Sequence, residues 1–151
     1  MAAGRLDIIN VIATALAGID QADGYNTTVA KVEKKLRDWN DVETYPRPWV
    51  GFRPTQETYQ YEPSHRLRCS MGLQLVAHLD VLPVDGADYE AIEKISDDII
   101  RALRQSVLRS GCAESITLTQ TDTTEGDPSG DESASLSMVF DVKYYRTEPM
   151  N

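Results

Sequence analysis

The stretch from Leu67 to Leu79, LRCSMGLQLVAHL, decides the fold of this chain. Its odd-numbered positions are all apolar, whereas its even-numbered positions are mostly polar or small. An alternation of period two predicts a β-strand with one buried and one open face, because a helical period would scatter the apolar side chains. Such a strand would run about 40 Å, whereas a compact chain of this size has a radius of gyration of about 15 Å. The strand is therefore expected to span or project from its domain, which suggests assembly with other subunits.

The composition is that of an acidic globular chain. Its 151 residues fit one domain, so residues 1–151 are predicted to form a single domain, and 41% hydrophobic residues is ordinary for a folded protein. The net charge of −9 argues against a surface that grips nucleic acid, although DNA could pass through a ring of such subunits without specific binding. Two cysteines, Cys69 and Cys112, are too few for a disulfide framework. The N-terminus lacks a signal-peptide pattern and no window is apolar for a membrane span, so no membrane association is expected.

Two amphipathic helices are predicted, one before and one after the central strand. Residues 3–17 carry apolar side chains at intervals of three and four, and Gly18 follows the last of them. Residues 87–109 repeat this pattern with acidic residues in the first turn, arginines near the end and Gly111 beyond. The helix dipole favours acidic residues at the start of a helix and basic residues at its end, so the second helix is predicted to span residues 87–109.

Four further strands are predicted. Residues 28–36 alternate weakly and carry lysines, which suits an edge strand, and residues 49–53 form a short strand that Pro54 closes. Tyr59 and Tyr61 are either interface anchors or half-buried tyrosines that cover a loop. The remaining segments are a loop (37–48), a hairpin connection or two ragged strand ends (55–64), and a C-terminal hairpin whose strands (115–121 and 134–146) flank a flexible acidic loop (122–133).

The resulting order, α-β-β-β-α-β-β, predicts an α+β fold. Since each clear strand has one apolar face, we expect a mainly antiparallel sheet of about five strands with both helices packed on one face. The other face is rich in Ser, Thr and Gln, and no segment is left over to cover it. His78 projects to this open face and His65 lies in the turn before the strand, so both histidines are predicted as surface residues.

The residues that usually carry chemistry form no recognisable pattern in this sequence. There is no Gly-rich phosphate loop, no Cys/His cluster with metal-ligand spacing and no nucleophile elbow. The carboxylates concentrate in loops and helix starts, where solubility and the helix dipole explain them. The chain is therefore predicted not to be an enzyme, and no cofactor or metal site is predicted.

The order and spacing of these segments resemble the tail terminator (tail completion) proteins of long-tailed bacteriophages. The matching segments cover most of the chain: the helix that ends before DGYNT, then VAKVEKKL, PWVGF, RLRCSMGLQLVAHL, AIEKISDDIIRALRQSV and SITLTQT…SLSMVFDVKYY. The resemblance implies an α+β subunit that assembles as a ring, typically a hexamer, on the head-proximal end of the tail tube. There the ring would end tube polymerisation and offer a docking surface for the head or neck.

The resemblance also implies partners, a location and interface segments. The partners would be further copies of the chain, the tail tube protein and a neck or head-completion protein. The location would be the virion, after assembly in the host cytoplasm. The interface would use the long strands, the loop before Trp49 and the acidic hairpin loop. The candidate interface residues are Trp39, Tyr45, Trp49, Arg68, Gln74, His78, Glu125, Asp127, Asp131 and Glu132.

Two other interpretations stay open. One is another neck, head-completion or minor tail protein with a similar subunit. The other, from a different class, is a small ligand-binding domain or enzyme that uses the open sheet face. A ring of about six subunits would favour an assembly protein, whereas a monomer with a defined pocket would favour ligand binding.

Overall fold

The computed structural model describes residues 4–42, 44–63, 66–81, 87–125 and 133–147. As predicted, the fold is α+β with a five-stranded, mostly antiparallel sheet, in the order β1-β2-β3-β5-β4. The pair β1–β2 is parallel and the other three pairs are antiparallel. The strands are β1 (Lys31–Glu33), β2 (Trp49–Glu62), β3 (Arg66–Asp80), β4 (Ser115–Glu125) and β5 (Ser133–Thr147).

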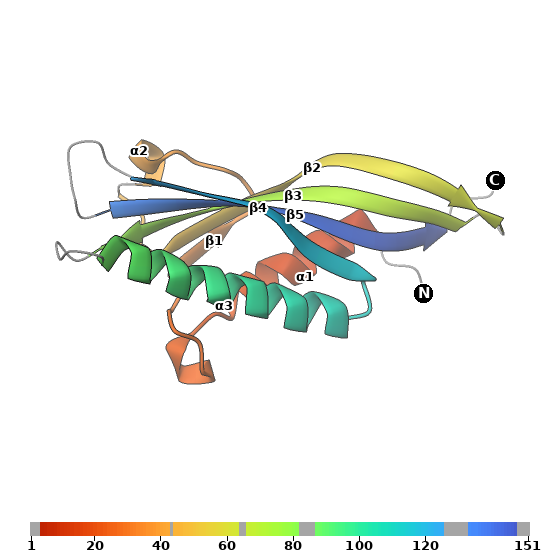
Figure 1. Cartoon of the computed structure of the whole chain (residues 1–151). Helices are drawn as coiled ribbons and strands as arrows, with labels where there is room; N and C mark the ends of the chain where they lie inside the picture. The colour runs from red at the N-terminus through yellow and green to blue at the C-terminus, as the bar shows by residue number, and fades with distance from the viewer. Residues whose placement is uncertain (1–3, 43, 64–65, 82–86, 126–132, 148–151) are drawn as a thin grey trace.

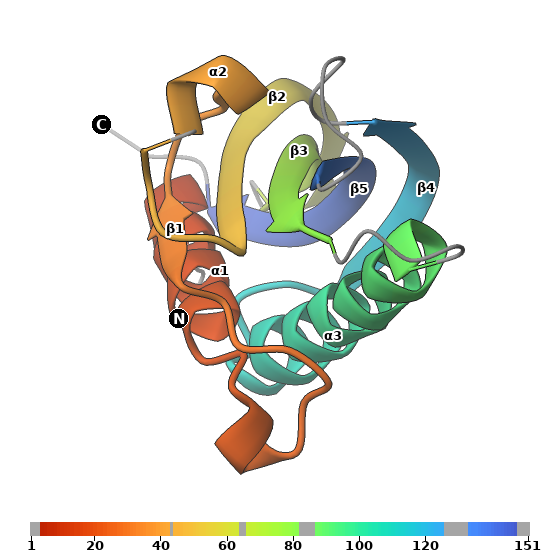
Figure 2. The same ribbon diagram turned by 90° about the vertical axis from the view of Figure 1, so that its left-hand side faces the viewer.

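The two long helices, α1 (Arg5–Ala17) and α3 (Ala87–Arg109), cover one face of the sheet, while α2 (Trp39–Val42) lies on the other side (Figure 2). The bounds of α3 match the predicted helix at 87–109, whereas the helix predicted at 3–17 begins at Arg5, with Gly4 as its N-cap. A 3-10 turn, η1 (Gln21–Asp23), follows α1. Within the described residues, none of these helices is long and apolar enough to cross a bilayer.

The core lies between the helices and the sheet. The alternation predicted for β3 is confirmed, because every odd-numbered side chain from Leu67 to Leu79 is buried. The partner strand β5 repeats it, with Leu136, Phe140 and Tyr144 on the same buried face. Each large apolar side chain buried in this way contributes about 1.5–3 kcal/mol. The helices supply the facing layer through Ile8, Ile12, Leu16, Ile92, Ile95, Ile99, Leu103 and Val107.

A buried carboxylate ties the segment after η1 to α3. Asp98 is 2% exposed and accepts hydrogen bonds from the backbone N–H groups of Asn26 (3.0 Å) and Thr27 (2.8 Å). The Thr27 hydroxyl donates a third hydrogen bond to the same carboxylate. A buried charge of this kind is tolerated because several donors satisfy it. The approach to β1 is therefore fixed by α3.

The second strand is longer than the sequence predicts. Pro54 does not close it, and residues 55–62 continue as strand instead of forming a hairpin connection. Since β1 pairs only with Trp49–Gly51, β2 is an edge strand beyond that point, where the missing N–H of a proline is tolerated. The register shifts between Pro54 and Glu57, and Gly72 on β3 leaves room for the Thr55 side chain, which a Cβ at Gly72 would strike.

Three strands run past the helices and form a projecting arm, defined here as residues 58–62, 66–70 and 143–147. The arm lies at the end of the molecule opposite the start of α3 (Figure 1). Its strands stay paired to their ends, because Glu62 lies opposite Arg66 and Arg66 opposite Thr147. The projection predicted from the length of the central strand is thus present.

Three local predictions need correction. The expected strand at 28–36 is reduced to β1, although it is at the sheet edge as predicted. The expected loop at 37–48 contains α2 and covers part of the open face, so the prediction that nothing covers this face is wrong. The expected loop at 122–133 is shortened, because β4 continues to Glu125 and β5 begins at Ser133.

Candidate functional site

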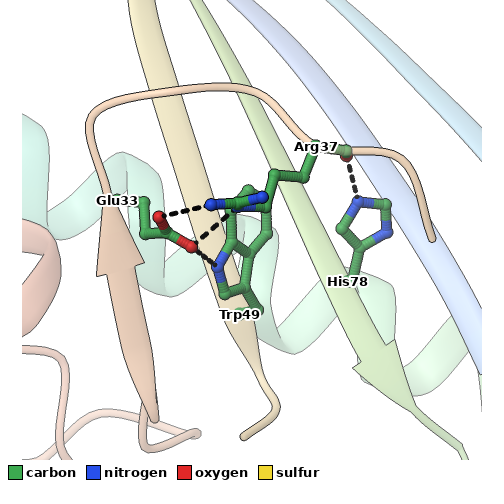
Figure 3. Close-up of polar contacts among 4 residues, drawn as sticks. All are labelled: Glu33, Arg37, Trp49 and His78. Atoms are coloured by element: carbon green, nitrogen blue, oxygen red, sulfur yellow. Dashed lines mark hydrogen bonds and ion pairs between the residues drawn. The ribbon is translucent and has the colours of Figure 1, made fainter. Parts of the chain in front are cut away.

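Residues 36–42 and 44–48 fold over one end of the open face and are here called the cap. Its anchor is His78 on β3, which is 3% exposed. His78 Nε2 lies 2.8 Å from the carbonyl oxygen of Arg37 (Figure 3). On the other side of the ring, Nδ1 lies 2.7 Å from Ser135 Oγ on β5. The prediction that His78 is a surface residue is therefore wrong, because the cap buries it.

Both tryptophans of the chain contact the His78 ring. The Trp49 indole, directly across from His78 on β2, stacks on it with ring centroids 5.4 Å apart. The Trp39 indole comes from the cap and meets it edge-on at 5.7 Å. Gly51 makes this packing possible, since a Cβ there would strike the Trp49 ring and the carbonyl oxygen of Lys35. The imidazole is thus enclosed by aromatic rings.

The hydrogen bonds fix the tautomer of the neutral His78 ring. The Arg37 carbonyl can only accept, so Nε2 carries the proton and donates, and Nδ1 accepts from the Ser135 hydroxyl. Burial lowers the pKa of His78, an effect that the Arg37 carbonyl and Asp38 partly oppose and Arg47 reinforces. The neutral imidazole is therefore the form that holds the cap in place.

A second anchor joins the cap to β1. Arg37 Nε and Nη2 donate to the two carboxylate oxygens of Glu33 at 3.0 and 3.2 Å, and Trp49 Nε1 donates to the same carboxylate at 3.0 Å (Figure 3). The pKa of Glu33 is lowered, mainly by the hydrogen bonds from Arg37 and against the effect of burial. Two parallel charge-assisted bonds give the pair a defined geometry. One carboxylate thus orients both the cap and the Trp49 ring.

Cations and aromatic rings complete the cap. The Tyr45 ring lies between Lys31 Nζ, 4.4 Å from its centroid, and the Arg37 guanidinium at 5.0 Å. Arg47 stacks over Trp39 at 5.2 Å and pairs with Asp80 at 2.7 Å. Cation–π contacts of this type contribute about 0.5–1 kcal/mol each at partly exposed positions.

Beside the cap, the open face carries a pocket of about 420 Å³. Its floor is formed by Gln74, His78 and Ser135 on the sheet, and its roof by Asp38 and Trp39. A serine next to a histidine is the pairing that nucleophilic catalysis uses. Ser135, however, lies in β5 between His78 of β3 and Thr124 of β4, so the backbone amides around it belong to the sheet ladders. Acyl transfer also needs free N–H donors for an oxyanion, so the geometry supports an anchoring role for this pair.

The arm carries the second candidate surface. Arg66 stacks over the Tyr145 ring at 3.6 Å and Arg68 lies 6.0 Å from the same ring. Arg68 also forms an ion pair with Glu114 at 3.5 Å, between two partly exposed side chains. Arg66 and Tyr145 were not predicted from sequence, because they meet only through the register of β3 and β5. The alternation that places Arg68 on the open face is the only sequence signal for this group.

The structure brings together five of the ten predicted interface residues. Trp39, Tyr45, Trp49, Gln74 and His78 all lie at or beside the cap. Trp49 is fully buried, so it cannot present a contact surface in this conformation.

Arg68 lies apart from them on the arm. Glu125 ends β4, and Asp127, Asp131 and Glu132 lie outside the described residues, as does His65. Among the described residues, no group of His, Cys, Asp or Glu side chains is arranged to hold a metal ion. No family model and no curated protein matches this chain.

Proposed function

We propose that this chain is a structural assembly protein of a long-tailed bacteriophage, of the tail terminator type. Copies of the chain would form a ring, hexameric by resemblance, on the head-proximal end of the tail tube. The ring would end tube polymerisation and provide the docking surface for the head or neck, with DNA passing through without specific binding. Its partners would be the tail tube protein and a neck or head-completion protein in the virion.

The observation that carries this proposal is the arm, because none of the described helices lies beneath its helix-side face at the tip (Figure 1). Tyr59 and Tyr61 lie on the same face as the buried Cys69 and Leu67, with which they pair, yet they are 52% and 69% exposed. Elsewhere on the sheet this face is covered by α1 and α3. Exposed aromatic side chains that continue a core face are typical of surfaces that another subunit covers.

The edges of the sheet also support assembly. Beyond Gly51, β2 has no strand on its outer side within the described residues, so Phe52 to Glu62 form an open edge. The far edge is formed by β4. Unpaired strand edges are templates for pairing with another chain, and proteins that remain monomeric usually shield them. Both edges suit a subunit that functions in contact with its neighbours.

The test is the particle phenotype of a phage that lacks this protein. A tail terminator predicts over-long tails without heads, because polymerisation has no stop. Filled heads that leak DNA would instead indicate the related head-completion role. Tails of normal length joined to heads would contradict both.

One observation favours a second candidate function. The pocket of about 420 Å³ beside the cap has the size of a small-molecule site and places polar groups from Gln74, Ser135 and Ser137 around it. A monomer that binds a small ligand there would favour this alternative. A ring with an empty pocket would favour the assembly role.

A further inference from the structure

The arm has a charge opposite to that of the whole chain. It contains four basic residues, Arg66, Arg68, Lys143 and Arg146, against one acidic residue, Glu62. The complete chain has a net charge of −9. Two copies of such a protein repel each other in most orientations, so a basic projection singles out one surface for attractive contact.

Three of the four basic side chains of the arm lie on its open face. Arg66, Arg68, Lys143 and Tyr145 occupy strand positions that alternate with the buried Leu67, Cys69 and Tyr144. Stacking on Tyr145 holds the Arg66 guanidinium flat, which leaves its N–H groups free at the ring edge for a carboxylate. Arginine held in this way loses less side-chain entropy when it binds a planar anion.

The opposite end of the molecule carries the complementary charge. There α3 begins, and its exposed face presents Glu90, Glu93 and Asp97 at the three- and four-residue spacing that aligns side chains along one side of a helix. Lys94 pairs with Glu90 at 2.9 Å, whereas Glu93 and Asp97 are exposed carboxylates. Tyr89, beside them, is 72% exposed. This end therefore combines carboxylates with an aromatic side chain.

We propose that the arm of one copy docks on the first half of α3 of the next copy, so that subunits join head to tail. Arg66 and Arg68 would bind Glu93 and Asp97 of the neighbour. The contact uses two different surfaces, and repetition of such a heterologous contact generates a ring if the rotation closes. This inference rests on the self-assembly that the proposed function requires. It adds which two surfaces of the subunit meet and that the subunits join head to tail.

A second copy fits the arm better than nucleic acid does. The arm exposes Tyr59 and Tyr61 on its helix-side face and carries the half-buried Tyr145 beside the arginines on its open face. Tyrosine and arginine are the residues enriched at protein–protein interfaces. A nucleic acid bound to the arm would be repelled by the rest of the molecule, because its phosphates and the chain as a whole are both negatively charged.

The experiment measures the mass of the full chain by sedimentation velocity at about 50 mM salt, where charged contacts are screened least. Wild type is expected to assemble, and R66E/R68E and E93K/D97K are each expected to weaken self-association at least about 100-fold, because like charges would face each other. A 1:1 mixture of the two variants is expected to restore assembly, since each then offers the surface that the other lacks. R66Q/R68Q is a milder variant that removes charge without introducing repulsion.

The matched control for R66E/R68E is K34E/K35E, which makes the same charge change at two exposed positions that lie on neither surface. It is expected to assemble like wild type. Circular dichroism confirms that each variant is folded. Raising the salt to about 500 mM, which shortens the Debye length to roughly 4 Å, is expected to shift wild type toward smaller species.

The outcomes separate this inference from the proposed function. If wild type assembles and R66E/R68E assembles equally well, the head-to-tail contact is wrong and the assembly role stands. A 1:1 mixture of R66E/R68E and E93K/D97K that stays dissociated would also overturn the proposed contact. If wild type remains a monomer at every concentration, the assembly role itself fails and the contact with it. If R66Q/R68Q abolishes binding to a short DNA duplex but leaves assembly unchanged, the arm is a nucleic-acid surface instead.

Discussion

Replacing His78 by alanine should release the cap from the open face of the sheet. The substitution removes hydrogen bonds to Arg37 and Ser135 of 2.8 and 2.7 Å and leaves the carbonyl of Arg37 without its donor. Two such bonds contribute about 1 kcal/mol each. Loss of the ring also opens a cavity between Trp39 and Trp49, which costs about 1–2 kcal/mol. The expected loss of unfolding free energy is about 3–4 kcal/mol, or roughly 8–14 °C in melting temperature for a chain of this size.

Urea unfolding followed by tryptophan fluorescence measures this effect directly, because both tryptophans of the chain pack against His78. The matched control is His78→Gln, whose amide can still donate to the Arg37 carbonyl and should recover part of the loss. A melting temperature for His78→Ala within about 2 °C of wild type would refute the role of His78 as the anchor of the cap.

Three further predictions concern the buried residues His78, Asp98 and Gly51. Burial lowers the folded-state pKa of His78 below its unfolded value of about 6.5, so its contribution to stability is complete above that pH and is lost as the pH falls through the folded pKa. Wild type should therefore lose stability below about pH 6.5, and the part of this loss that is due to His78 should be missing in His78→Gln. Urea midpoints measured across this pH range test the difference. Asp98→Ala should lower the free energy of unfolding by about 2–4 kcal/mol, because three donors from Asn26 and Thr27 lose their acceptor. Asp23→Ala, at an exposed position outside both proposed surfaces, is the control and should change the free energy of unfolding in urea by less than about 0.5 kcal/mol. Gly51→Ala should destabilise the chain by about 2 kcal/mol or more, because a methyl group there would strike the Trp49 ring and the carbonyl oxygen of Lys35. The control is Gly18→Ala, because a Cβ there would lie at an ordinary distance of 3.5 Å from its nearest atoms. Its melting temperature should remain close to that of wild type.

The regular elements were predictable where hydrophobic periodicity runs long. The strand around Leu67–Leu79 and the helix at 87–109 show many repeats of a single period, and the structure has both. The prediction that Pro54 ends a strand was wrong, because a proline is tolerated where its strand has no outer partner. Among the described residues β2 has none beyond Gly51, which is a property of the sheet. A local sequence pattern does not indicate which strands are neighbours in the sheet.

The cap was missed for the same reason. His78 looks exposed from its position on a polar strand face, and only the fold brings the cap segment with Trp39 over it. The arginine–tyrosine stack on the arm likewise depends on the register between β3 and β5, which places Arg68 opposite Tyr145. Contacts that join segments far apart in the chain leave no periodic signal.

The proposed ring is tested most directly by negative-stain microscopy of the purified full chain, with the mass of the particle measured on the same sample. The proposal predicts rings of uniform diameter with a central opening, and a mass that is a fixed multiple of the subunit mass. A monodisperse monomer, with no rings on the grid at any concentration, would contradict it.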